Sequence, residues 1–377
     1  MNDEEQAVLD AVCRFAGDVL APAAGEIDEA ALFVTRHLEP MANLGLFGLN
    51  LPERWGGIGL RPEIMFEAVA SVAGACGSTA SMLTAHFLAT DAILIGGADD
   101  LRGRYLPGAA AGRRLGAFAL TEPLAGSNPA DMTTRAEHTS DGYHLKGVKH
   151  FISNGGEADF IVVFAKTDKA AGHRGISAFV VDRDTPGFSA GPAERTMGLK
   201  GGHVFELSFD CVVPEQNRIG EEGGGFRTAM KTLDNGRIEV AAMCVGIAAA
   251  ALDAACRWSK DRQVGGEPIA SFQGLQWMLA DMATELQASR LMALDAAAKR
   301  GRGERFSQEA AMAKLHASEM AARVTDAALQ IHGGYGYSQD MPLERYVRDV
   351  RIMRIYEGSS EIQRNIIARN LLTQYDE

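Results

Sequence analysis

Cysteine is scarce in this chain, and basic residues are fewer than acidic ones. Five cysteines are scattered over 377 residues and none forms a CxxC pair, so no zinc site is predicted and the thiols are expected to be reduced, as in a cytosol. The 37 Lys and Arg against 49 Asp and Glu give a formal net charge of −12. A phosphate-binding surface normally needs a basic excess, which argues against a nucleic-acid or anionic-membrane partner but leaves room for one small anionic ligand.

Signals for export and membrane insertion are also missing. The first five residues, Met1 to Glu5, are acidic where a targeting peptide would be basic. The longest apolar run, residues 240–252, is bounded by Glu239 and Asp253 and is too short to cross a bilayer. We therefore expect a soluble, cytoplasmic protein without a membrane partner.

Several common catalytic and cofactor motifs are absent as well. No GxGxxG follows a predicted strand and no GxxxxGK[ST] occurs, which disfavours a dinucleotide-binding fold and nucleotide hydrolysis. HExxH and GxSxG are also missing, so a zinc protease and a hydrolase nucleophile elbow have no support.

The hydrophobic pattern divides the chain into three regions. Up to about residue 110 it predicts helices around 7–19, ending before Pro22, over 63–75 and over 79–95, with a glycine-rich loop at 44–59. Short Val-, Ile- and Phe-rich runs then predict antiparallel strands over 143–148, 160–166, 176–182 and 204–209. Helical spacing returns over 227–260, 272–300, 307–332 and 341–372.

The predicted fold class is therefore α+β and multidomain. We assign residues 1–115 to an N-terminal helical domain, residues 116–225 to a middle antiparallel β domain, and residues 226–377 to a C-terminal helical domain that resembles a four-helix bundle.

Three segments contain candidate binding residues. Residues 118–127 (FALTEPLAGS) place two hydroxyls and small residues after a hydrophobic run, a composition that can clamp a planar ring or a phosphate. Residues 151–156 (FISNGG) place an aromatic ring and a hydroxyl on one strand face. By themselves these two segments are also typical of an ordinary strand turn and of core packing. The third segment carries arginines at 345, 348, 351 and 354, a spacing that predicts a solvated helix face.

Glu357 is the candidate catalytic base. Within residues 355–364 (IYEGSSEIQR) it stands where one helix is expected to end and the next to begin, with Ser360 and Gln363 fitting a capping box. A carboxylate at such a break can face a cavity, and burial would raise its pKa towards neutrality, which suits a general base. The alternative is that Glu357 only stabilises a helix N-terminus.

Taken together, these segments resemble the acyl-CoA dehydrogenase family, over nearly the whole chain and in the same order. The resemblance implies that family's fold, FAD as the cofactor, Glu357 as the catalytic base and no metal. It implies cofactor contacts, some of them to the FAD of a neighbouring subunit, from Phe118, Leu120, Thr121, Gly126, Ser127, Phe151, Ser153, Arg262, Gln273, Gln330, Gly333, Gly334, Ser359 and Glu361. It implies substrate contacts from Ser127, Asp234, Arg237, Tyr356 and Gly358.

Four positions depart from the common family pattern. Phe151 and Ser153 replace the commoner Trp and Thr, a conservative change that should keep the stacking and the hydroxyl. Gly265 stands where the family usually has Phe, so an aromatic contact to the cofactor is expected to be missing. Asn128 stands where Asp is common, which removes a local charge. Gly236 occupies the helix position that carries the base in a minority of the family, which leaves Glu357 as the only candidate.

The resemblance also implies a reaction. Glu357 would take the α-proton of an acyl-CoA thioester while the β-hydrogen leaves as hydride to flavin N5, giving the trans-2-enoyl-CoA. Electron-transferring flavoprotein is the expected electron acceptor, a homotetramer is the expected assembly, and fatty acid or amino acid catabolism is the expected setting.

Three alternatives stay open. The acyl group could be bound to an acyl carrier protein, since both carriers present the same phosphopantetheine arm. The chain could be a flavin oxidase of the same fold, although acyl-CoA oxidases are usually longer and nitroalkane oxidases have Asp at the base position. It could also be a non-enzymatic binding protein that retained the fold, which the presence of Glu357, Ser127 and Arg262 disfavours.

Overall fold

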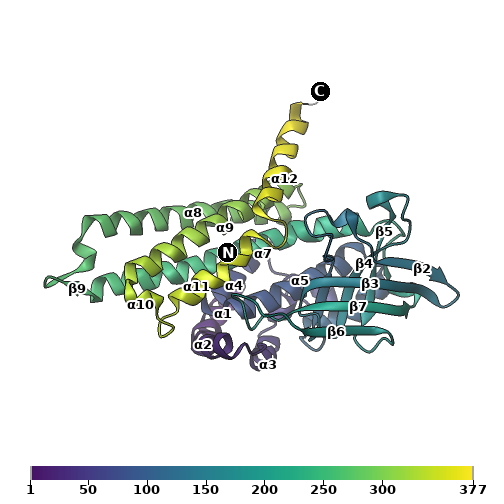
Figure 1. Ribbon diagram of the computed structural model, residues 1–377, viewed down its shortest axis with the longest axis horizontal. Coiled ribbons are helices and arrows are strands. Elements are labelled where there is room, and N and C mark those ends of the chain that lie inside the picture. The colour runs from purple at the N-terminus through teal and green to yellow at the C-terminus, as the bar shows by residue number, and fades with distance from the viewer. Residues whose placement is uncertain (1, 376–377) are drawn as a thin grey trace.

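The computed structural model describes residues 2–375 and consists of helices at both ends of the chain with a sheet between them (Figure 1). The sheet lies at one end of the elongated molecule, and the longest helices extend away from it. The predicted order of helical, β and helical regions is confirmed. Residues 1, 376 and 377 of the predicted outer domains lie outside the described residues.

The N-terminal region is helical. Its helices are α1 (Asp3–Phe15), α2 (Ala21–Ala30), α3 (Thr35–Asn43), α4 (Pro62–Ala75), α5 (Gly77–Gly96) and α6 (Asp99–Ala110). The prediction that the first helix ends before Pro22 is wrong, because α1 continues through a π-helical turn into α2, and Pro22 lies in the first turn of α2. A proline is tolerated there because the N–H that it lacks would have no helical acceptor.

The middle region is one eight-stranded sheet with the order β6-β7-β3-β2-β4-β5-β8, in which β1 pairs with β4. The strands are β1 (Gly116–Ala119), β2 (Arg135–Thr139), β3 (Gly142–Ser153), β4 (Phe160–Lys166), β5 (Ile176–Asp182), β6 (Phe188–Ala193), β7 (Val204–Val213) and β8 (Arg218–Ile219). Most pairs are antiparallel, but β1 runs parallel to β4. A parallel pair needs a long connection, which the β2–β3 hairpin supplies.

The C-terminal region is built around α7 (Gly225–Asp261), with α8 (Gln273–Gly301), α9 (Ser307–His332), α10 (Gly334–Tyr337), α11 (Leu343–Val350) and α12 (Ser360–Leu372). The short strands β9 (Gln263–Val264) and β10 (Glu267–Pro268) form a hairpin at the end of α7. Helix α7 packs against α9, α4, α5 and α8. Its close approach to α4 requires Gly246, because a Cβ there would lie 2.0 Å from the Ala70 carbonyl oxygen.

Within the described chain, two helices, α5 and α7, are long and apolar enough to cross a membrane by length and composition alone. The apolar windows are 83% and 72% buried inside the protein. Such burial is what the central helices of a packed core show, because their apolar side chains face neighbouring helices on most sides.

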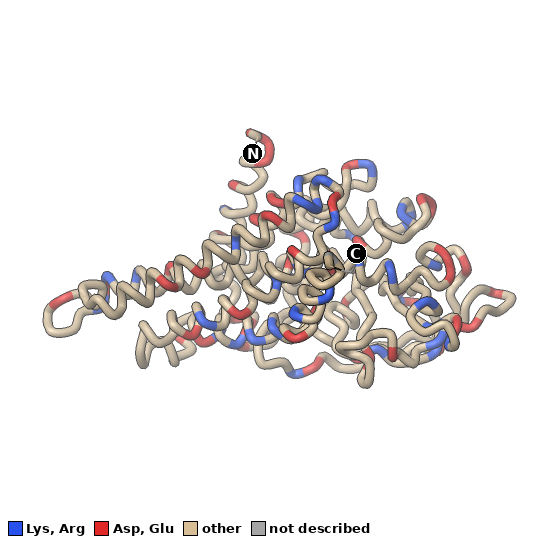
Figure 2. Tube along the Cα trace, turned by 90° about the horizontal axis from the view of Figure 1, so that it is seen from above, with Lys and Arg blue, Asp and Glu red and all other residues tan. Residues whose placement is uncertain are grey.

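Acidic and basic residues are interspersed along the helices (Figure 2). The prediction of a solvated arginine face is wrong for Arg348, which donates to Asp28 of α2 at 2.6 and 2.8 Å and also pairs with Glu344. Arg354 pairs with Glu319 of α9 at 3.3 Å. Arg348 thus connects α11 to α2, and Arg354, in the turn after α11, connects that turn to α9, because each arginine forms an ion pair with an acid on the other helix.

Candidate active site

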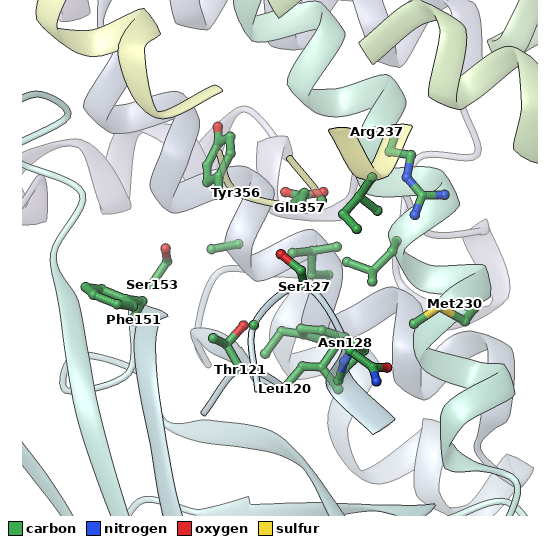
Figure 3. Close-up of a pocket in the computed structure, with 18 of the residues that line it drawn as sticks. Leu120, Thr121, Ser127, Asn128, Phe151, Ser153, Met230, Arg237, Tyr356 and Glu357 are labelled. Atoms are coloured by element: carbon green, nitrogen blue, oxygen red, sulfur yellow. The ribbon is translucent and has the colours of Figure 1, made fainter. Parts of the chain in front are cut away.

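A cavity of about 450 Å³ lies where the sheet, α5, α7 and the segment before α12 meet (Figure 3). The structure brings many of the predicted site residues to its wall: Phe118, Leu120, Thr121, Gly126, Ser127, Phe151, Ser153, Arg237, Tyr356, Glu357 and Gly358. Glu357 and Tyr356 lie on one side of the space, and the Ser127 hydroxyl lies on the other. Residues more than 200 positions apart in sequence therefore share one site.

The loop that carries Ser127 rests on a buried ion pair. Lys149 Nζ of β3 donates to Glu122 Oε1 at 2.9 Å and to the Leu120 carbonyl at 3.1 Å. Glu122 Oε2 accepts from the backbone N–H and the hydroxyl of Thr133 at 2.6 and 2.8 Å. Burial acts to raise the pKa of Glu122, but Lys149 and these donors bring it to about 2. The pair thus connects both ends of the loop to β3.

Phe151 leaves the regular path of β3 at a β-bulge. The pairing of β3 with β7 shifts between Lys149 and Ile152, and Phe151 has φ +57°, which is rare for an aromatic residue. The ring stacks on His150 with 4.1 Å between centroids and is 63% exposed. Phe151 and Ser153 line the cavity (Figure 3), and the Ile152 side chain between them is buried in the core beside it.

Glu357 lies in a strained turn between α11 and α12. Its φ is +51°, a left-handed value that costs a non-glycine residue on the order of 1–3 kcal/mol, and Gly358 follows with φ +91°. Such a conformation persists only when its surroundings hold it. Gln363 Nε2 donates to the carbonyls of Glu357 and Gly358 at 3.2 and 2.8 Å, and Lys314 Nζ donates to the Gly358 carbonyl at 2.7 Å.

The predicted capping box at Ser360 is wrong. Ser359 is the N-cap of α12, and its hydroxyl accepts from the Ile362 N–H at 3.5 Å. Ser360 instead donates to Glu319 at 2.6 Å. The turn at Gly358 lets α12 begin one residue earlier than predicted, which frees Gln363 to reach back to the turn at Glu357 and Gly358.

The Glu357 carboxylate lies directly over α7. A Cβ at Gly236 would lie 2.1 Å from Glu357 Oε2, so the carboxylate occupies the space that any other residue would fill. Within residues 2–375, Oε2 is buried and has no hydrogen-bond partner. Burial raises the pKa of Glu357 to about 7, although Lys314 and Arg237 act to lower it. A carboxyl with this pKa can accept a proton at neutral pH and release it again.

Of the two predicted substrate residues Asp234 and Arg237, which form an ion pair, only Arg237 lines the cavity in the described chain. Arg237 lines the cavity, whereas Asp234 lies behind it and binds the Arg237 guanidinium and the Ser307 hydroxyl. Burial lowers the pKa of Arg237, and Asp234 acts against that shift. Asp234 therefore orients Arg237 from behind and does not line the cavity.

A second cavity of about 540 Å³ lies at the far end of the bundle, beside the β9–β10 hairpin. It is lined by Arg262, Gly333 and Gly334, three of the residues that the resemblance relates to a neighbour's cofactor. The Arg262 guanidinium lies 6.0 Å from the ring centroid of Tyr335, which also lines it. Gly265 has φ +64° in the hairpin turn, a conformation in which the Phe of the family pattern would be strained.

Four predicted cofactor residues line neither of these cavities in the described chain: Gln273, Gln330, Ser359 and Glu361. Gln273 and Gln330 are exposed. Ser359 and Glu361 lie at the start of α12, next to Gly358.

Sequence reasoning missed two walls of the main cavity. Helix α5 contributes Ser81, Thr84, Ala85 and Leu88, and α12 contributes Ile362, Asn365, Ile366 and Arg369. The α12 residues recur at the spacing of one helix face, a signal that could have been read once the helix start was known. Lys314 and the Glu122–Lys149 pair were also missed.

Among residues 2–375, no group of His, Cys, Asp or Glu is arranged to hold a metal ion.

Comparison with known proteins defines the class. Residues 2–113, 117–212 and 223–372 match the N-terminal, middle and C-terminal domains of acyl-CoA dehydrogenases. The match covers most of the chain, and the protein is an oxidoreductase. The chain belongs to the acyl-CoA dehydrogenase family, which depends on FAD.

Two curated relatives match over almost the full length. An acryloyl-CoA reductase (NADH) of Anaerotignum propionicum is 44% identical over 98% of this chain and 94% of its own. A short-chain-specific acyl-CoA dehydrogenase of Clostridium acetobutylicum is 40% identical over 98% of both chains.

Solved structures agree with this fold. Butyryl-CoA dehydrogenase from Megasphaera elsdenii superimposes with a TM-score of 0.96 at 40% identity, covering 99% of each chain. A chain from a structure described as the electron transferring flavoprotein of Acidaminococcus fermentans gives 0.97 at 42% identity, covering 99% of this chain and 98% of that one. The structure described as PigA with FAD and proline gives 0.95 at 29% identity, covering 99% of each.

Proposed function

We propose that this chain catalyses the FAD-dependent α,β-dehydrogenation of an acyl-CoA thioester, with Glu357 as the base that takes the α-proton. The observation that carries the proposal is the Glu357 carboxylate, which is buried, has one oxygen without a hydrogen-bond partner in the described chain, and lines a cavity of about 450 Å³. Burial raises its pKa to about 7, which suits a base that must be ionised near neutral pH.

The residues around the main cavity fit the isoalloxazine ring of FAD. Phe151 presents an exposed aromatic face, while Thr121, Ser127 and Ser153 bring hydroxyls to the wall and Phe118 is apolar. Apart from its two chain neighbours, no residue described by the structure lies within 4 Å of the position of a Cβ at Gly126, so the loop leaves open space there. When bound, FAD supplies a hydride acceptor at N5 for the β-hydrogen of the substrate.

The chain itself supplies the proton chemistry. In the described structure the backbone N–H of Glu357 makes no hydrogen bond, so it can donate to the thioester oxygen as negative charge develops during proton removal. The Leu88 side chain and the Tyr356 ring line the cavity beside the carboxylate and make its surroundings partly apolar. Arg237, oriented by Asp234, places a positive charge beside the same space.

The second cavity supports an oligomer. Arg262, Gly333 and Gly334 lie at the opposite end of the bundle from Glu357, so a second copy of the chain is needed to bring them to the same cofactor. We therefore propose a homotetramer in which Gln273 and Gln330 also contact a neighbour's FAD. Light scattering of the yellow holoenzyme is expected to give an oligomer. A monomer that carries one FAD per chain would contradict this arrangement.

Ser153 is proposed to donate a hydrogen bond near flavin N5. Replacing Ser153 by Ala removes one neutral hydrogen bond, worth about 0.5–1.5 kcal/mol. We expect flavin reduction to slow by about threefold to tenfold, or the flavin potential to fall correspondingly, with FAD content unchanged. Stopped-flow absorbance and a reductive titration measure the two quantities. If the rate of flavin reduction and the flavin potential are both unchanged, Ser153 does not donate this hydrogen bond and has only a structural role in the strand.

Gly236 is proposed to be required because its missing side chain makes room for the base. In Gly236→Ala the new Cβ would meet Glu357 Oε2 at 2.1 Å and Leu88 at 2.8 Å. We expect flavin reduction to fall by roughly tenfold or more, because small displacements of a positioned group are costly. Gly274→Ala is the control, since nothing lies within 4 Å of its Cβ. Equal stopped-flow rates in the two variants would show that the carboxylate is free to move.

The decisive experiment is an anaerobic titration of the holoenzyme with a panel of acyl-CoAs of different length and branching, following flavin bleaching. A parallel series with acyl groups on acyl carrier protein tests the carrier, and peroxide release in air tests the oxidase alternative. Electron-transferring flavoprotein is the proposed acceptor, and the cytoplasm the proposed location. No bleaching by any thioester would contradict the proposed function.

The similarity to an acryloyl-CoA reductase (NADH) favours a second candidate, the reverse reaction. Proton transfer at Glu357 is reversible, so the same residues would serve reduction of a 2-enoyl thioester. Mixing the reduced enzyme with a 2-enoyl-CoA and following the return of the flavin band tests this direction.

A further inference from the structure

The catalytic turn is held from behind by one buried lysine. Lys314 lies on α9, its side chain is completely buried, and its Nζ donates to the Gly358 carbonyl at 2.7 Å. An ammonium group has three donors, and in the described chain the bond to Gly358 is the one hydrogen bond that Lys314 Nζ makes. The surrounding α9 residues are mainly alanine, so the charge sits in apolar surroundings.

Burial of this charge is unfavourable unless a nearby group compensates it. Burial lowers the pKa of Lys314 to about 8, while Cys244 and Glu357 act to raise it. Lys314 is in turn the first of the two cations that act to lower the pKa of Glu357. Each group therefore stabilises the charged form of the other.

Among the other ionisable groups near this pair, Arg237 and Glu319 have partners of their own, and Glu239 is a buried acid. Arg237 is engaged by Asp234, and Glu319 is engaged by Arg354 and Ser360. Glu239, one helical turn from Gly236, is fully buried, and burial together with Asp91 raises its pKa well above the usual value, which disfavours its charged form. Ionisable groups on four elements influence Glu357 and Lys314 directly or through Arg237: Arg237, Glu239 and Cys244 on α7, Glu319 on α9, Tyr356 on the turn, and Glu361 and Arg369 on α12. Two further groups, Asp91 on α5 and Arg300 on α8, influence the pKa of Glu239.

We propose that Lys314 is the positioning residue of the catalytic base: its ammonium anchors the Gly358 carbonyl of the strained turn and its charge keeps Glu357 ionised at neutral pH. This inference rests on the proposed function of Glu357. The anchor acts together with the Gln363 amide to hold the left-handed backbone at Glu357, and the positive charge of Lys314 offsets part of the effect of burial, which favours the protonated base.

The two roles are separable by substitution. Lys314→Met keeps a long stem but removes the charge and the donor, whereas Lys314→Gln removes the charge and keeps a donor for the Gly358 carbonyl. Without the positive charge, Glu357 binds its proton more tightly. The pH midpoint of flavin reduction by a saturating acyl-CoA is therefore expected to move upward by at least about one pH unit in both variants.

The expected rate profile follows from the direction of that shift. Below pH 7 both variants should reduce the flavin about tenfold more slowly than the unmodified enzyme. At alkaline pH Lys314→Gln should recover nearly the full rate, and Lys314→Met should recover less because the turn has lost its anchor. Lys299→Met is the matched control: its ammonium pairs with Glu309 at 2.7 Å in the same bundle, and its midpoint should stay unchanged.

A titration of the resting holoenzyme by infrared difference spectroscopy reports the same midpoint without turnover. The carboxylic acid band of Glu357 is assigned by its loss in Glu357→Gln, and it should disappear at higher pH in the Lys314 variants. A uniform loss of rate at every pH with an unmoved midpoint would overturn the charge role of Lys314. If Lys314→Met fails to form holoenzyme, Lys314→Gln decides by the same midpoint. Failure of the unmodified enzyme to bleach at any pH would instead contradict the proposed function.

Discussion

Replacing Glu357 by Gln is expected to lower the rate of flavin reduction by an acyl-CoA by at least ~10²-fold, the usual scale for loss of a positioned general base. Gln keeps the size of the side chain, so the contact with Gly236 and the left-handed turn should survive. FAD content and acyl-CoA binding should therefore be close to those of the unmodified enzyme. Stopped-flow bleaching with a saturating substrate measures the effect.

The pH dependence of the unmodified enzyme tests the same assignment. Burial raises the pKa of Glu357 to about 7, and only the ionised form accepts the α-proton. The rate should therefore rise with pH through about 7 and then level off, falling about tenfold for each pH unit below that value. Glu357→Asp should keep partial activity, because its carboxylate is withdrawn by one methylene. Bleaching at a comparable rate in Glu357→Gln would place the base elsewhere.

Replacing Lys149 by Met is expected to destabilise the folded protein by about 3–5 kcal/mol, the range for breaking a buried ion pair by removing one partner. The side chains of Lys149 and Glu122 are 0% and 3% exposed, so the substitution leaves the Glu122 carboxylate buried without its counter-charge. The loop that carries Ser127 should loosen at the same time, with weaker FAD binding. Urea unfolding followed by circular dichroism measures the stability.

Lys146→Met is the matched control for that experiment. Lys146 lies on the same strand, is half exposed, and pairs with Asp210 at the surface at 3.0 Å. Surface pairs of this kind contribute about 0–1 kcal/mol. Similar losses in the two variants would mean that the buried pair has no special role in holding the loop.

Much of the fold follows from local patterns in the sequence. The long helices and four strands, β3, β4, β5 and β7, were predicted, although β3 and β7 extend further than expected, because period and composition are local properties. The strands β1, β2, β6 and β8 were not predicted. Two errors come from competition between short-range signals. Pro22 fits the first turn of a new helix as well as the end of an old one, and the choice between Ser359 and Ser360 as the cap depends on the backbone of Gly358.

The candidate site was predictable only in part, for a different reason. Glu357, Tyr356 and Arg237 lie in segments with a recognisable pattern, and the structure places all three on one cavity. The α5 wall and Lys314 have no local signal, because an apolar helix and a lone lysine look alike whether or not they face a site. For Asp234 the error runs the other way. The resemblance implied a substrate contact, but in the structure its carboxylate binds the Arg237 guanidinium and the Ser307 hydroxyl outside the cavity.

The contact between Glu357 and Gly236 also constrains how such a protein can change over generations. The space beside Gly236 on α7 holds one carboxylate, which a residue at position 357 in the turn or a residue at position 236 on the helix could supply. A first mutation of Gly236 to an acidic residue would place two carboxylates in one volume, and a first mutation of Glu357 to Gly would leave none. Neither order offers a functional intermediate by a direct route. A lineage would be expected to cross between the two arrangements rarely, through a duplicate gene copy released from selection or through two changes fixed together.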